Sequence, residues 1–544
     1  MRVLLALVAF AALSSAAQAT SSDELRAVLE RRVGGDRTGM CVAAAVIEQS
    51  VATAYVCADP KTARPFDEHT AFEIGSVTKT MTAALLAQLI LKGEVSLDDP
   101  LAKLLPAGTV VPTFNGEPIL LKHVVTHTSG LPALPARLTP TDVRNFYATL
   151  TEKQLLDSLA EAKLATKPGT TFAYSNFAMM VLSYALAKRA GKDFESLLTE
   201  KLLAPLQMKD TYIAHKPERV RIAPAHMTNG LPTLNWDFPV DMAGVGGVRA
   251  TLPDMVRYAQ AQLRPADNEL GRAIALTQKQ VIDVPGARMA MNWFLDSGAA
   301  GGQLTHGGGT GGYASLVIIE PGTNRAVVLL SDTSDADIGA LNTIGAHLLD
   351  SKKVLREPRR VATPPAALLD ALVGRFRLSS GLGMTLRRRG DALAIQADGQ
   401  PEFVMGYDSA ADFYALLFDA LLRPVRRKDG SYTFTWHQLG GVLRAEKLDA
   451  TAPAQTFQIS VAELKAYEGE YPLLAGFSLK IFVGNDKLFA QGTGQQPIEL
   501  TPVAKDVFVS EAVGAEITFE RNASSAVVAL TLKQNGQALR GVRR

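Results

Sequence analysis

Ser76 is the only serine in this 544-residue chain with a lysine three residues on, and this spacing suits nucleophilic catalysis. The stretch from residue 72 reads Phe-Glu-Ile-Gly-Ser-Val-Thr-Lys, and a helix-like apolar run follows from Val77 to Leu91. A helix would place Ser76 and Lys79 on one face, one turn apart and within hydrogen-bond reach. Because burial lowers the pKa of an amine, Lys79 could share the proton of the Ser76 hydroxyl and make this oxygen nucleophilic.

Two further segments carry groups that acyl transfer uses. Tyr174-Ser-Asn176 is the only Tyr-x-Asn in the chain; a phenol can relay protons, and an amide can donate to a substrate carbonyl. The segment His306-Gly-Gly-Gly-Thr-Gly-Gly-Tyr313 leads into the strand-like run 315–319, so it offers bare backbone against which a substrate could lie. A tight glycine turn that binds nothing is the other interpretation of this segment.

Ser76-Val-Thr-Lys79, Tyr174-Ser-Asn176 and His306-Gly-Gly308, in this order and spacing, resemble the three motifs of one superfamily of serine hydrolases. This is the superfamily of class C β-lactamases, DD-peptidases and esterases, and the likeness covers about residues 25 to 350. Four other stretches fit it as well: residues 95–100, 126–132, 246–254 and 313–321.

The resemblance implies an α+β catalytic domain of the β-lactamase/transpeptidase-like kind, in which helices flank an antiparallel sheet. It implies that Ser76 attacks the substrate carbonyl and that Lys79 and Tyr174 exchange protons with it and with the leaving group. The backbone N–H groups of Ser76 and Gly309 would form the oxyanion hole. Water would then hydrolyse the acyl-enzyme, and no metal or organic cofactor is required.

The resemblance also assigns substrate contacts to Asn176, His306 and Gly308. One of these positions departs from the family, since β-lactamases and many DD-peptidases carry Lys-Thr where this chain has His306-Gly307. A histidine is only partly charged near neutral pH, and glycine removes a hydroxyl, so tight binding of a substrate carboxylate is not expected. Esterases and D-aminopeptidases of the family often carry His-x-Gly.

The expected substrate is therefore a small molecule or peptide: a D-amino-acid peptide, another amide or an ester. A peptidase or amidase of the D-aminopeptidase or D-Ala-D-Ala carboxypeptidase type comes first, then a carboxylesterase, then a β-lactamase. A fourth alternative is a penicillin-recognising sensor domain that is acylated once and does not turn over. The fold alone cannot choose among these activities.

Two other chemistries are rejected on their motifs. The run His306-Gly-Gly-Gly309 also imitates the oxyanion motif of α/β-hydrolase lipases, but those enzymes need a later Gly-x-Ser-x-Gly, and none follows. His123 and His127 have the spacing of a helical zinc pair, yet the glutamate of His-Glu-x-x-His is missing. No metal site is predicted.

The composition and the N-terminus bear on partners and location. The net charge of +2 is too small to predict a nucleic-acid partner, and no apolar stretch is long enough to predict a membrane span. Met1-Arg2, a short apolar run and Ala17-Gln-Ala19 are typical of a signal peptide over residues 1–19, with cleavage after Ala19. The sequence therefore predicts a periplasmic or secreted protein.

The two cysteines, Cys41 and Cys57, flank strand-like runs at 42–47 and 51–56, and both are eight residues from Gln49. A hairpin centred there would make them face each other. An oxidising compartment would allow a disulfide, with two free buried thiols as the alternative, and neither state is catalytic.

Pro-bearing, apolar-poor segments at 351–365 and 449–460 predict linkers and divide the chain after the signal peptide. A catalytic domain is expected over 20–350, and two small antiparallel β-barrel domains over 366–448 and 461–544. The two small units form a repeat at an offset of 95 residues, for example Val373-Gly-Arg-Phe against Glu468-Gly-Glu-Tyr. Together with the catalytic unit, they resemble the three-domain layout of bacterial D-stereospecific aminopeptidases.

Overall fold

The computed structural model describes residues 19–61, 66–296, 302–334, 339–438, 441–448, 459–474, 477–493, 495–510, 515–522, 524–534 and 537–544. Apart from Ala19, the predicted signal peptide lies outside these residues. The chain divides into two compact units, Met1–Pro358 and Arg359–Arg544. Each unit is described by itself below.

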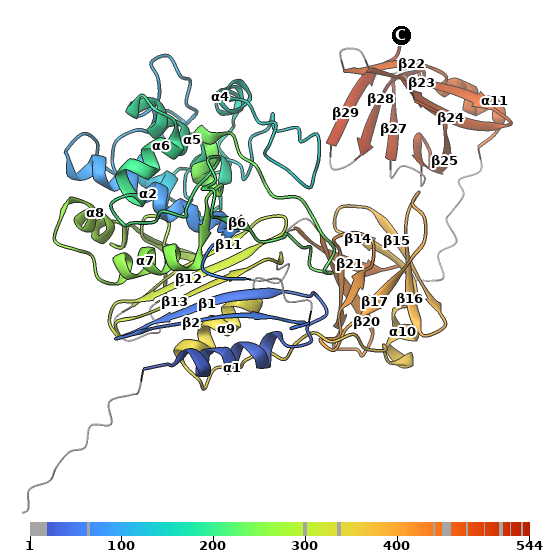
Figure 1. The fold of residues 1–544 in the computed structure, drawn as a ribbon. Helices are drawn as coiled ribbons and strands as arrows, with labels where there is room; N and C mark the ends of the chain where they lie inside the picture. Colours follow the sequence, from blue (N-terminus) through green and yellow to red (C-terminus); the bar gives the residue numbers. More distant parts are fainter. Residues whose placement is uncertain are drawn as a thin grey trace, which may run out of the picture. The chain divides into compact units, whose positions relative to one another are not determined.

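The first unit is built on an eight-stranded antiparallel sheet (Figure 1). Its strands, in spatial order, are β2 (Val51–Cys57), β1 (Cys41–Ile47), β13 (Arg325–Ser331), β12 (Ala314–Glu320), β11 (Gln303–Gly309), β10 (Phe294–Asp296), β9 (Ala287–Met289) and β8 (Ile282–Val284). The chain therefore enters the sheet through the β1–β2 hairpin, leaves it for over 200 residues and returns to complete it.

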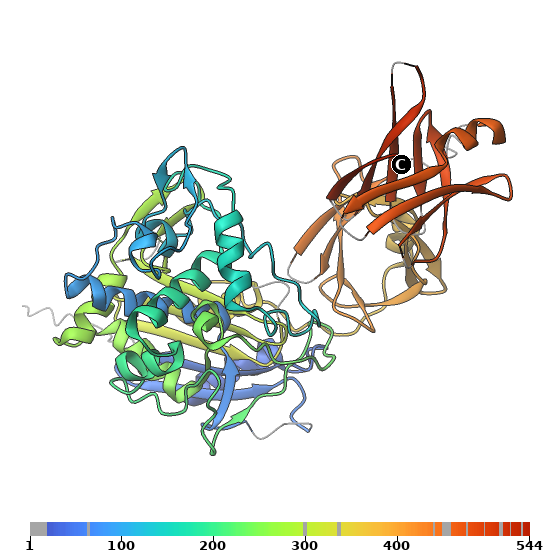
Figure 2. The same cartoon turned by 90° about the horizontal axis from the view of Figure 1, so that it is seen from above.

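Helices cover both faces of this sheet (Figures 1 and 2). On one face lie α1 (Ser22–Val33) and α9 (Gly339–Leu349), and on the other α2 (Thr78–Leu91), α5 (Asn176–Ala190), α7 (Leu252–Leu263) and α8 (Glu269–Thr277). Every residue of β1 is buried because alternate side chains enter different cores. Val42 packs with Leu25 of α1, whereas Ala43 belongs to the core that contains α2 and α5.

Shorter elements complete the first unit. They are β3 (Thr70–Glu73), η1 (Gly75–Val77), η2 (Leu101–Lys103), β4 (Thr113–Phe114), β5 (Glu117–Pro118), α3 (Leu121–Val125), α4 (Glu152–Glu161), α6 (Phe194–Leu198), η3 (Thr199–Leu203), β6 (Arg221–Ile222), η4 (Val240–Val245) and β7 (Arg249–Thr251). A second, three-stranded sheet joins β6, β3 and β7. Among the helices that the structure describes, none has the length and apolar character needed to cross a membrane.

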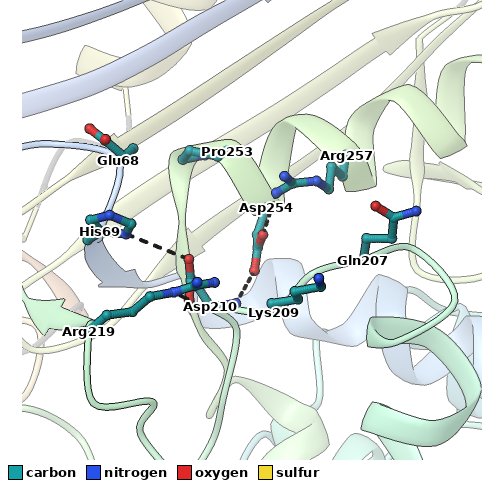
Figure 3. A pocket seen from close by; sticks show the side chains of 9 residues that line it. All are labelled: Glu68, His69, Gln207, Lys209, Asp210, Arg219, Pro253, Asp254 and Arg257. Carbon is teal, nitrogen blue, oxygen red and sulfur yellow. Dashed lines mark hydrogen bonds and ion pairs between the residues drawn. The ribbon is translucent and has the colours of Figure 1, made fainter.

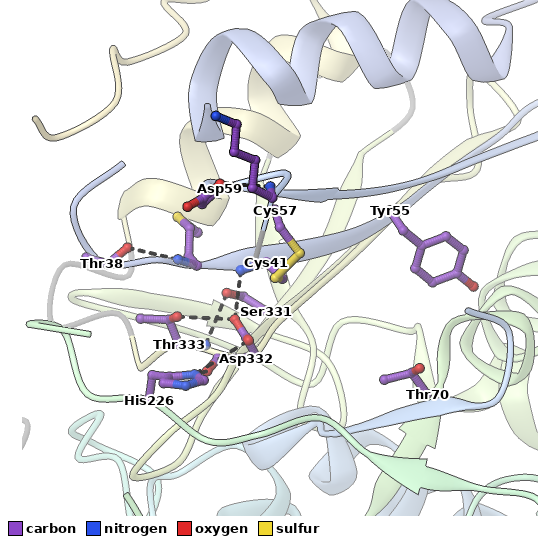
Figure 4. Close-up of a disulfide and its surroundings, with 12 residues drawn as sticks. Thr38, Cys41, Tyr55, Cys57, Asp59, Thr70, His226, Ser331, Asp332 and Thr333 are labelled. Carbon is purple, nitrogen blue, oxygen red and sulfur yellow. Dashed lines mark hydrogen bonds and ion pairs between the residues drawn. A yellow bond between two sulfur atoms is a disulfide. The ribbon is translucent and has the colours of Figure 1, made fainter. Parts of the chain in front are cut away.

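The β1–β2 hairpin places Cys41 directly opposite Cys57. The two sulfur atoms form a disulfide, and the Cα atoms are 4.0 Å apart (Figure 4). The buried carboxylate of Asp332 accepts the N–H of Cys41 at 2.7 Å and lies 3.5 Å from Nδ1 of His226. The bridge and this carboxylate together fix the edge of the sheet to the end of β13.

The second unit contains two eight-stranded antiparallel β structures. The first is a closed barrel of β14 (Gly374–Leu378), β15 (Gly383–Arg389), β16 (Ala392–Ala397), β17 (Phe403–Tyr407), β18 (Phe413–Ala415), β19 (Leu421–Arg426), β20 (Tyr432–Gln438) and β21 (Gly441–Lys447). The second is a barrel-like sheet of β22 (Gly469–Leu474), β23 (Phe477–Gly484), β24 (Lys487–Gly492), β25 (Ile498–Ala504), β26 (Val507–Ser510), β27 (Ala515–Arg521), β28 (Val527–Gln534) and β29 (Gln537–Val542).

Each β structure is preceded by a short helical segment, α10 (Ala366–Leu372) or α11 (Val461–Leu464) with η5 (Lys465–Tyr467). The two helices begin 95 residues apart, as do β14 and β22, which matches the repeat seen in the sequence. Part of the predicted linker 351–365 belongs to the barrel, since Ala362 donates its N–H to Tyr407 and Ser409 donates to Arg360.

Candidate active site

Ser76 lies in the short helix η1, between strand β3 and helix α2. The sequence predicted a helix from Val77, and the structure inserts this tighter turn before α2 begins at Thr78. The N–H of Ser76 is in the first turn, where backbone donors have no acceptor within the helix. Gly75 has a φ of +49°, and a Cβ at this position would lie 2.6 Å from the amide nitrogen of Gly309. Only glycine lets these two backbone segments approach so closely.

Strand β11 is held against this turn by Gly308 and Ser315. A Cβ on Gly308 would lie 2.0 Å from the carbonyl oxygen of Ile74, and the Ser315 hydroxyl donates to the same oxygen at 2.7 Å. Nothing lies within 4 Å of the space beside Gly309, where a Cβ would be. The N–H groups of Ser76 and Gly309 thus belong to two touching segments, with open space for a ligand next to one of them.

Lys79 lies one turn after Ser76, as the spacing predicted, and it is fully buried. Its Nζ lies 2.8 Å from Ser76 Oγ and 2.7 Å from the carbonyl oxygen of Val245, in hydrogen-bonding contact with both. No carboxylate within the described residues pairs with this amine. Burial therefore lowers the pKa of Lys79 well below its usual value.

Tyr174 ends the loop that precedes α5, whose first turn is capped by Ser175. The Lys79 Nζ lies 5.0 Å from the centre of the Tyr174 ring, and the phenol also interacts with Ser76. Burial raises the pKa of Tyr174, and the interaction with Ser76 offsets this rise only in part. The phenol is therefore protonated at neutral pH.

Asn176 is the first residue of α5, and its amide nitrogen donates to the Tyr147 hydroxyl over a long 3.4 Å. Its Oδ1 is buried and has no hydrogen-bond partner among the described residues. Tyr147 belongs to an aromatic cluster with Phe146, Trp236 and Phe238; its ring stacks on Phe238 at 4.8 Å and meets Trp236 edge-on at 5.3 Å. Asn176 therefore offers a free acceptor beside an aromatic surface.

The aromatic cluster also touches the glycines around Ser76. A Cβ on Gly311 would lie 2.5 Å from Trp236 Nε1, and one on Gly246 would lie 3.5 Å from Gly75 and 3.7 Å from Phe238. The rings of Trp236 and Phe238 are only half-buried. An apolar, partly exposed wall therefore lies next to the Ser76 turn.

The His306 imidazole does not carry the partial positive charge that the sequence predicted. The expectation was an imidazole that is partly charged near neutral pH; the side chain is instead buried in β11, and burial and the nearby Lys79 lower its pKa to about 3. The ring Nδ1 lies 2.7 Å from the carbonyl oxygen of Gly307, and Nε2 has no hydrogen-bond partner among the described residues. The imidazole is neutral, so it offers no positive charge to a substrate carboxylate.

The glycine segment is also more regular than expected. Gly307, Gly308 and Gly309 are paired with β12 as part of strand β11, and the turn itself comes later, around Thr310 to Tyr313. The glycine turn that the sequence left open for His306–Tyr313 is therefore present only over Thr310–Tyr313, and His306–Gly309 is regular strand.

Several residues that shape the site escaped the sequence analysis. Val245 contributes only a carbonyl oxygen, which any residue could supply. Glu73 is three residues before Ser76; its buried Oε1 accepts the N–H of Trp236 at 2.9 Å and lies 3.3 Å from the Arg249 guanidinium. The Phe72-Glu73 pair was the only available signal, because a carboxylate inside an apolar strand must find partners.

A separate cavity of about 230 Å³ lies elsewhere in the first unit (Figure 3). Its carboxylates already have partners: Asp210 binds Arg219 at 2.6 Å, and Asp254 binds Arg257 at 2.8 Å. None of the predicted site residues lines this cavity. In the described part of the chain, no group of three His, Cys, Asp or Glu side chains could hold a metal ion.

Residues 25–348 match the family model described as Beta-lactamase. The chain belongs to this family. It is therefore a serine hydrolase, as the three motifs predicted. Residues 453–543 match a second model, described as a domain of unknown function (DUF3471).

Curated relatives in the Beta-lactamase family have different activities in their names. D-alanyl-D-alanine-carboxypeptidase/endopeptidase AmpH of Escherichia coli (strain K12) is 34% identical over 268 residues, which cover 46% of this chain and 68% of AmpH. Beta-lactamase of the same strain is 30% identical over 43% of this chain and 60% of the relative. Esterase EstB of Burkholderia gladioli is 31% identical over 38% of this chain and 53% of EstB.

Solved structures support the fold assignment. A class C beta-lactamase aligns with a TM-score of 0.52 and 18% identity, over 61% of this chain and 98% of that chain. A point mutant of a class C beta-lactamase aligns with a TM-score of 0.50 and 20% identity, over 57% of this chain and 92% of that chain. The predicted fold class, a β-lactamase/transpeptidase-like α+β domain followed by two β-barrel-like units, is confirmed.

Proposed function

We propose that Ser76 is the nucleophile of a peptidase or amidase that works through an acyl-enzyme. The observation that carries the proposal is the contact between Ser76 Oγ and the buried amine of Lys79, at 2.8 Å. A serine hydroxyl is a weak nucleophile until a neighbouring base takes its proton. Lys79 has no carboxylate partner in the described residues and a lowered pKa, so it supplies that base.

Tyr174 acts as a proton relay in this proposal. Its phenol is protonated in the free enzyme and interacts with Ser76. The proton of Ser76 moves to Lys79 as the Oγ–C bond forms, and the phenol of Tyr174 donates a proton to the departing nitrogen as the C–N bond breaks. Lys79 then returns its proton to Tyr174, which leaves both groups ready for the next step.

The negative charge that develops on the substrate oxygen is stabilised by the N–H groups of Ser76 and Gly309. The contact of Gly75 with Gly309 supports this assignment, because it brings the two donor segments together. Water then attacks the acyl-enzyme with the proton transfers reversed, and Ser76 is regenerated. Asn176, His306 and Gly308 bind the substrate, through the free Oδ1, the free Nε2 and the β11 backbone.

The substrate class follows from the likeness to AmpH and from the charge of His306. The AmpH name describes cleavage of D-alanyl-D-alanine peptides, and this relative is matched over 68% of its length. Because His306 is neutral, a D-amino-acid peptide or amide with no carboxylate near β11 fits better than one that ends there. This favours the D-aminopeptidase type over the D-Ala-D-Ala carboxypeptidase type.

A carboxylesterase is the second candidate, and the aromatic cluster supports it. The half-buried rings of Trp236 and Phe238 beside the nucleophile suit an apolar acyl or alcohol group, and an ester needs no charged anchor. EstB, matched over 53% of its length, carries esterase in its name.

The activity is tested by steady-state hydrolysis of three substrates: D-alanine p-nitroanilide, a short-chain p-nitrophenyl ester and a chromogenic cephalosporin. Turnover of the anilide that is lost in Ser76→Ala supports the peptidase, and turnover of the ester alone supports the esterase. Rapid turnover of the cephalosporin contradicts the argument from His306. One covalent adduct per chain with no turnover of any substrate would instead indicate a sensor.

We also propose that the enzyme is exported to the periplasm or secreted. The signal-peptide pattern over residues 1–19 and the disulfide between Cys41 and Cys57 support this location, because disulfides persist in oxidising compartments. The intact mass of the protein recovered outside the cytoplasm tests it. A chain that begins at Thr20 is expected, and an uncleaved chain that is confined to the cytoplasm contradicts the proposal.

A further inference from the structure

His127 lies in the loop after α3 and contacts both neighbours of Tyr174. Its carbonyl oxygen accepts the N–H of Ala173 at 2.8 Å, and its side-chain Nδ1 accepts the N–H of Ser175 at 3.2 Å. These bonds hold the backbone immediately before and after the tyrosine. The backbone of His127 has a φ of +54°, a left-handed conformation that histidine adopts more readily than most residues.

The ring of His127 also stacks on the ring of Tyr174 itself. The two centroids are 4.0 Å apart and the planes are inclined by 28°. Behind this pair, Phe172 meets His127 edge-on at 6.2 Å, and Phe294 connects Phe172 to His306 with centroid distances of 6.0 and 5.7 Å. The ring of Tyr174 is therefore packed against the first of four side-chain rings that contact one another in sequence.

His127 is neutral in this setting. It is completely buried, and burial, together with Lys79 and His306, lowers its pKa well below the usual value. A neutral ring is required by the geometry as well, because Nδ1 can accept the N–H of Ser175 only when it carries no proton.

We propose that His127 is the positioning residue of Tyr174: its ring and its Nδ1 together hold the phenol at the distance from Ser76 that proton relay requires. This inference rests on the proposed function, in which Tyr174 relays the proton. His127 does not contact the substrate in this account. A displacement of the phenol by about 1 Å would slow acylation on the order of 100-fold.

Two substitutions separate the two contacts. His127→Asn removes the stacked ring, while asparagine tolerates the left-handed backbone and can still accept a hydrogen bond. His127→Phe keeps a flat ring and removes the acceptor. The rate of acylation and the substrate dissociation constant are measured in the stopped-flow with D-alanine p-nitroanilide, because its departing nitrogen needs the proton that Tyr174 donates. Rates are counted per Ser76 that reacts with a p-nitrophenyl phosphonate, so that a misfolded fraction does not enter the rate.

We expect His127→Asn to slow acylation by about 10- to 100-fold and to change the dissociation constant less than threefold. We expect His127→Phe to recover part of this loss, because the phenol again has a ring to rest on. The deciding comparison uses Tyr174→Phe, which removes the hydroxyl that is being positioned. In that background, His127→Asn should change the acylation rate less than twofold.

If His127 shapes the site without acting through the Tyr174 hydroxyl, its substitution slows both backgrounds by the same factor, and the inference is wrong. It is equally wrong if His127→Asn leaves the acylation rate unchanged, or if it raises the dissociation constant and spares the rate. Ser76→Ala is run in parallel. Turnover that survives in Ser76→Ala contradicts the proposed function, whereas loss of turnover there with equal factors in the cycle contradicts only the role of His127.

His123 provides a matched control. It is also a buried histidine of this region, its Nδ1 accepts the N–H of Leu120 at 3.1 Å, and burial lowers its pKa to about 4. It makes no ring contact with Tyr174 among the described residues. His123→Asn should therefore acylate within about twofold of the wild type, and a loss as large as that of His127→Asn would contradict the specific role of His127.

Discussion

Gly75 and Gly309, far apart in the sequence, meet so closely that a Cβ on Gly75 would lie 2.6 Å from the Gly309 amide nitrogen. Any side chain at Gly75 must push the Ser76 turn away from β11, and its φ of +49° adds strain for any other residue. We therefore expect Gly75→Ala to lower kcat/KM at least 100-fold through loss of oxyanion stabilisation. Steady-state kinetics with a p-nitrophenyl ester measures this loss.

Gly93 is the matched control for that substitution. It has a left-handed φ of +72° too, but nothing lies within 4 Å of the position of a Cβ. Gly93→Ala should cost roughly 1 kcal/mol of unfolding free energy and leave kcat/KM unchanged. Equal kinetic losses in the two variants would show that backbone strain, and not the contact with Gly309, causes the effect.

Lys79 is expected to be necessary for activity and to lower the unfolding free energy of the protein at neutral pH. Its amine is buried and its pKa is lowered, so at neutral pH the unfolded chain binds more protons at this residue than the folded chain does. The unfolding free energy therefore rises with pH from the folded pKa up to about 10.5. Lys79→Met should abolish acylation and raise the unfolding free energy at pH 7 by about 1 kcal/mol.

Urea denaturation at pH 7 and pH 10 checks this expectation. The cost of burying the amine decreases at higher pH, because the lysine of the unfolded chain also loses its proton there. The difference in unfolding free energy between Lys79→Met and the wild type should therefore be smaller at pH 10 than at pH 7. A variant that is less stable than the wild type at both values would mean that the contacts of the amine with Ser76 and Val245 outweigh its burial.

The titration of the buried side chains of His127 and His306 should not contribute to the pH profile of kcat/KM between pH 5 and 8. The pKa of His306 is lowered to about 3 and that of His127 is well below its usual value, so both rings stay neutral over this range. We expect kcat/KM to rise with pH in one step, as Lys79 loses its proton. An inflection near pH 6.5 that disappears in His306→Gln would contradict the neutral state of His306.

His306→Lys should restore the charge that β-lactamases usually carry at this position. A cation there gives a substrate carboxylate a partner, so KM for a peptide that ends in D-alanine should fall on the order of 10-fold. The kinetics of an uncharged ester provide the comparison and should change far less. A lower KM for both substrates would indicate a general change of the site and not recognition of charge.

Removal of the disulfide should affect stability and spare catalysis. The bridge joins residues 16 apart in the sequence. Closing a loop of this length lowers the entropy of the unfolded chain and so stabilises the folded state by about 3 kcal/mol. Cys41→Ser with Cys57→Ser should lower the unfolding free energy of the first unit by about this amount. The kinetic constants at 25 °C should not change, because the bridge joins the two strands of the β1–β2 hairpin, whereas Ser76 lies in η1.

The parts of this site that were predictable from the sequence are those fixed by local geometry. The contact of Ser76 with Lys79 follows from one helical turn, and the register of Cys41 with Cys57 follows from a hairpin of alternating residues. The β repeat in the second unit was visible because its turn residues and apolar positions recur at one offset. In each case a short stretch of chain determines the result.

What could not be predicted depends on residues that are far apart in the chain or on burial. The Val245 carbonyl that binds Lys79 carries no signal in its side chain, and the neutral state of His306 is set by the packing around it. The spacing of His127 from His123 suggested only a zinc pair, which was rejected because the glutamate is missing, and no sequence pattern indicated a positioning role. Only the fold shows that its Nδ1 is already occupied by the backbone of Ser175.

The central claim, an acyl-enzyme on Ser76, is tested most directly by intact-mass analysis of the enzyme quenched during the first turnover of a p-nitrophenyl ester. The account predicts one acyl group per chain, located on the peptide that contains Ser76, with a burst of about one equivalent of p-nitrophenol where deacylation is slow. Ser76→Ala should show neither the adduct nor the burst. An acyl group on another residue, or hydrolysis by Ser76→Ala at the wild-type rate, would contradict the account.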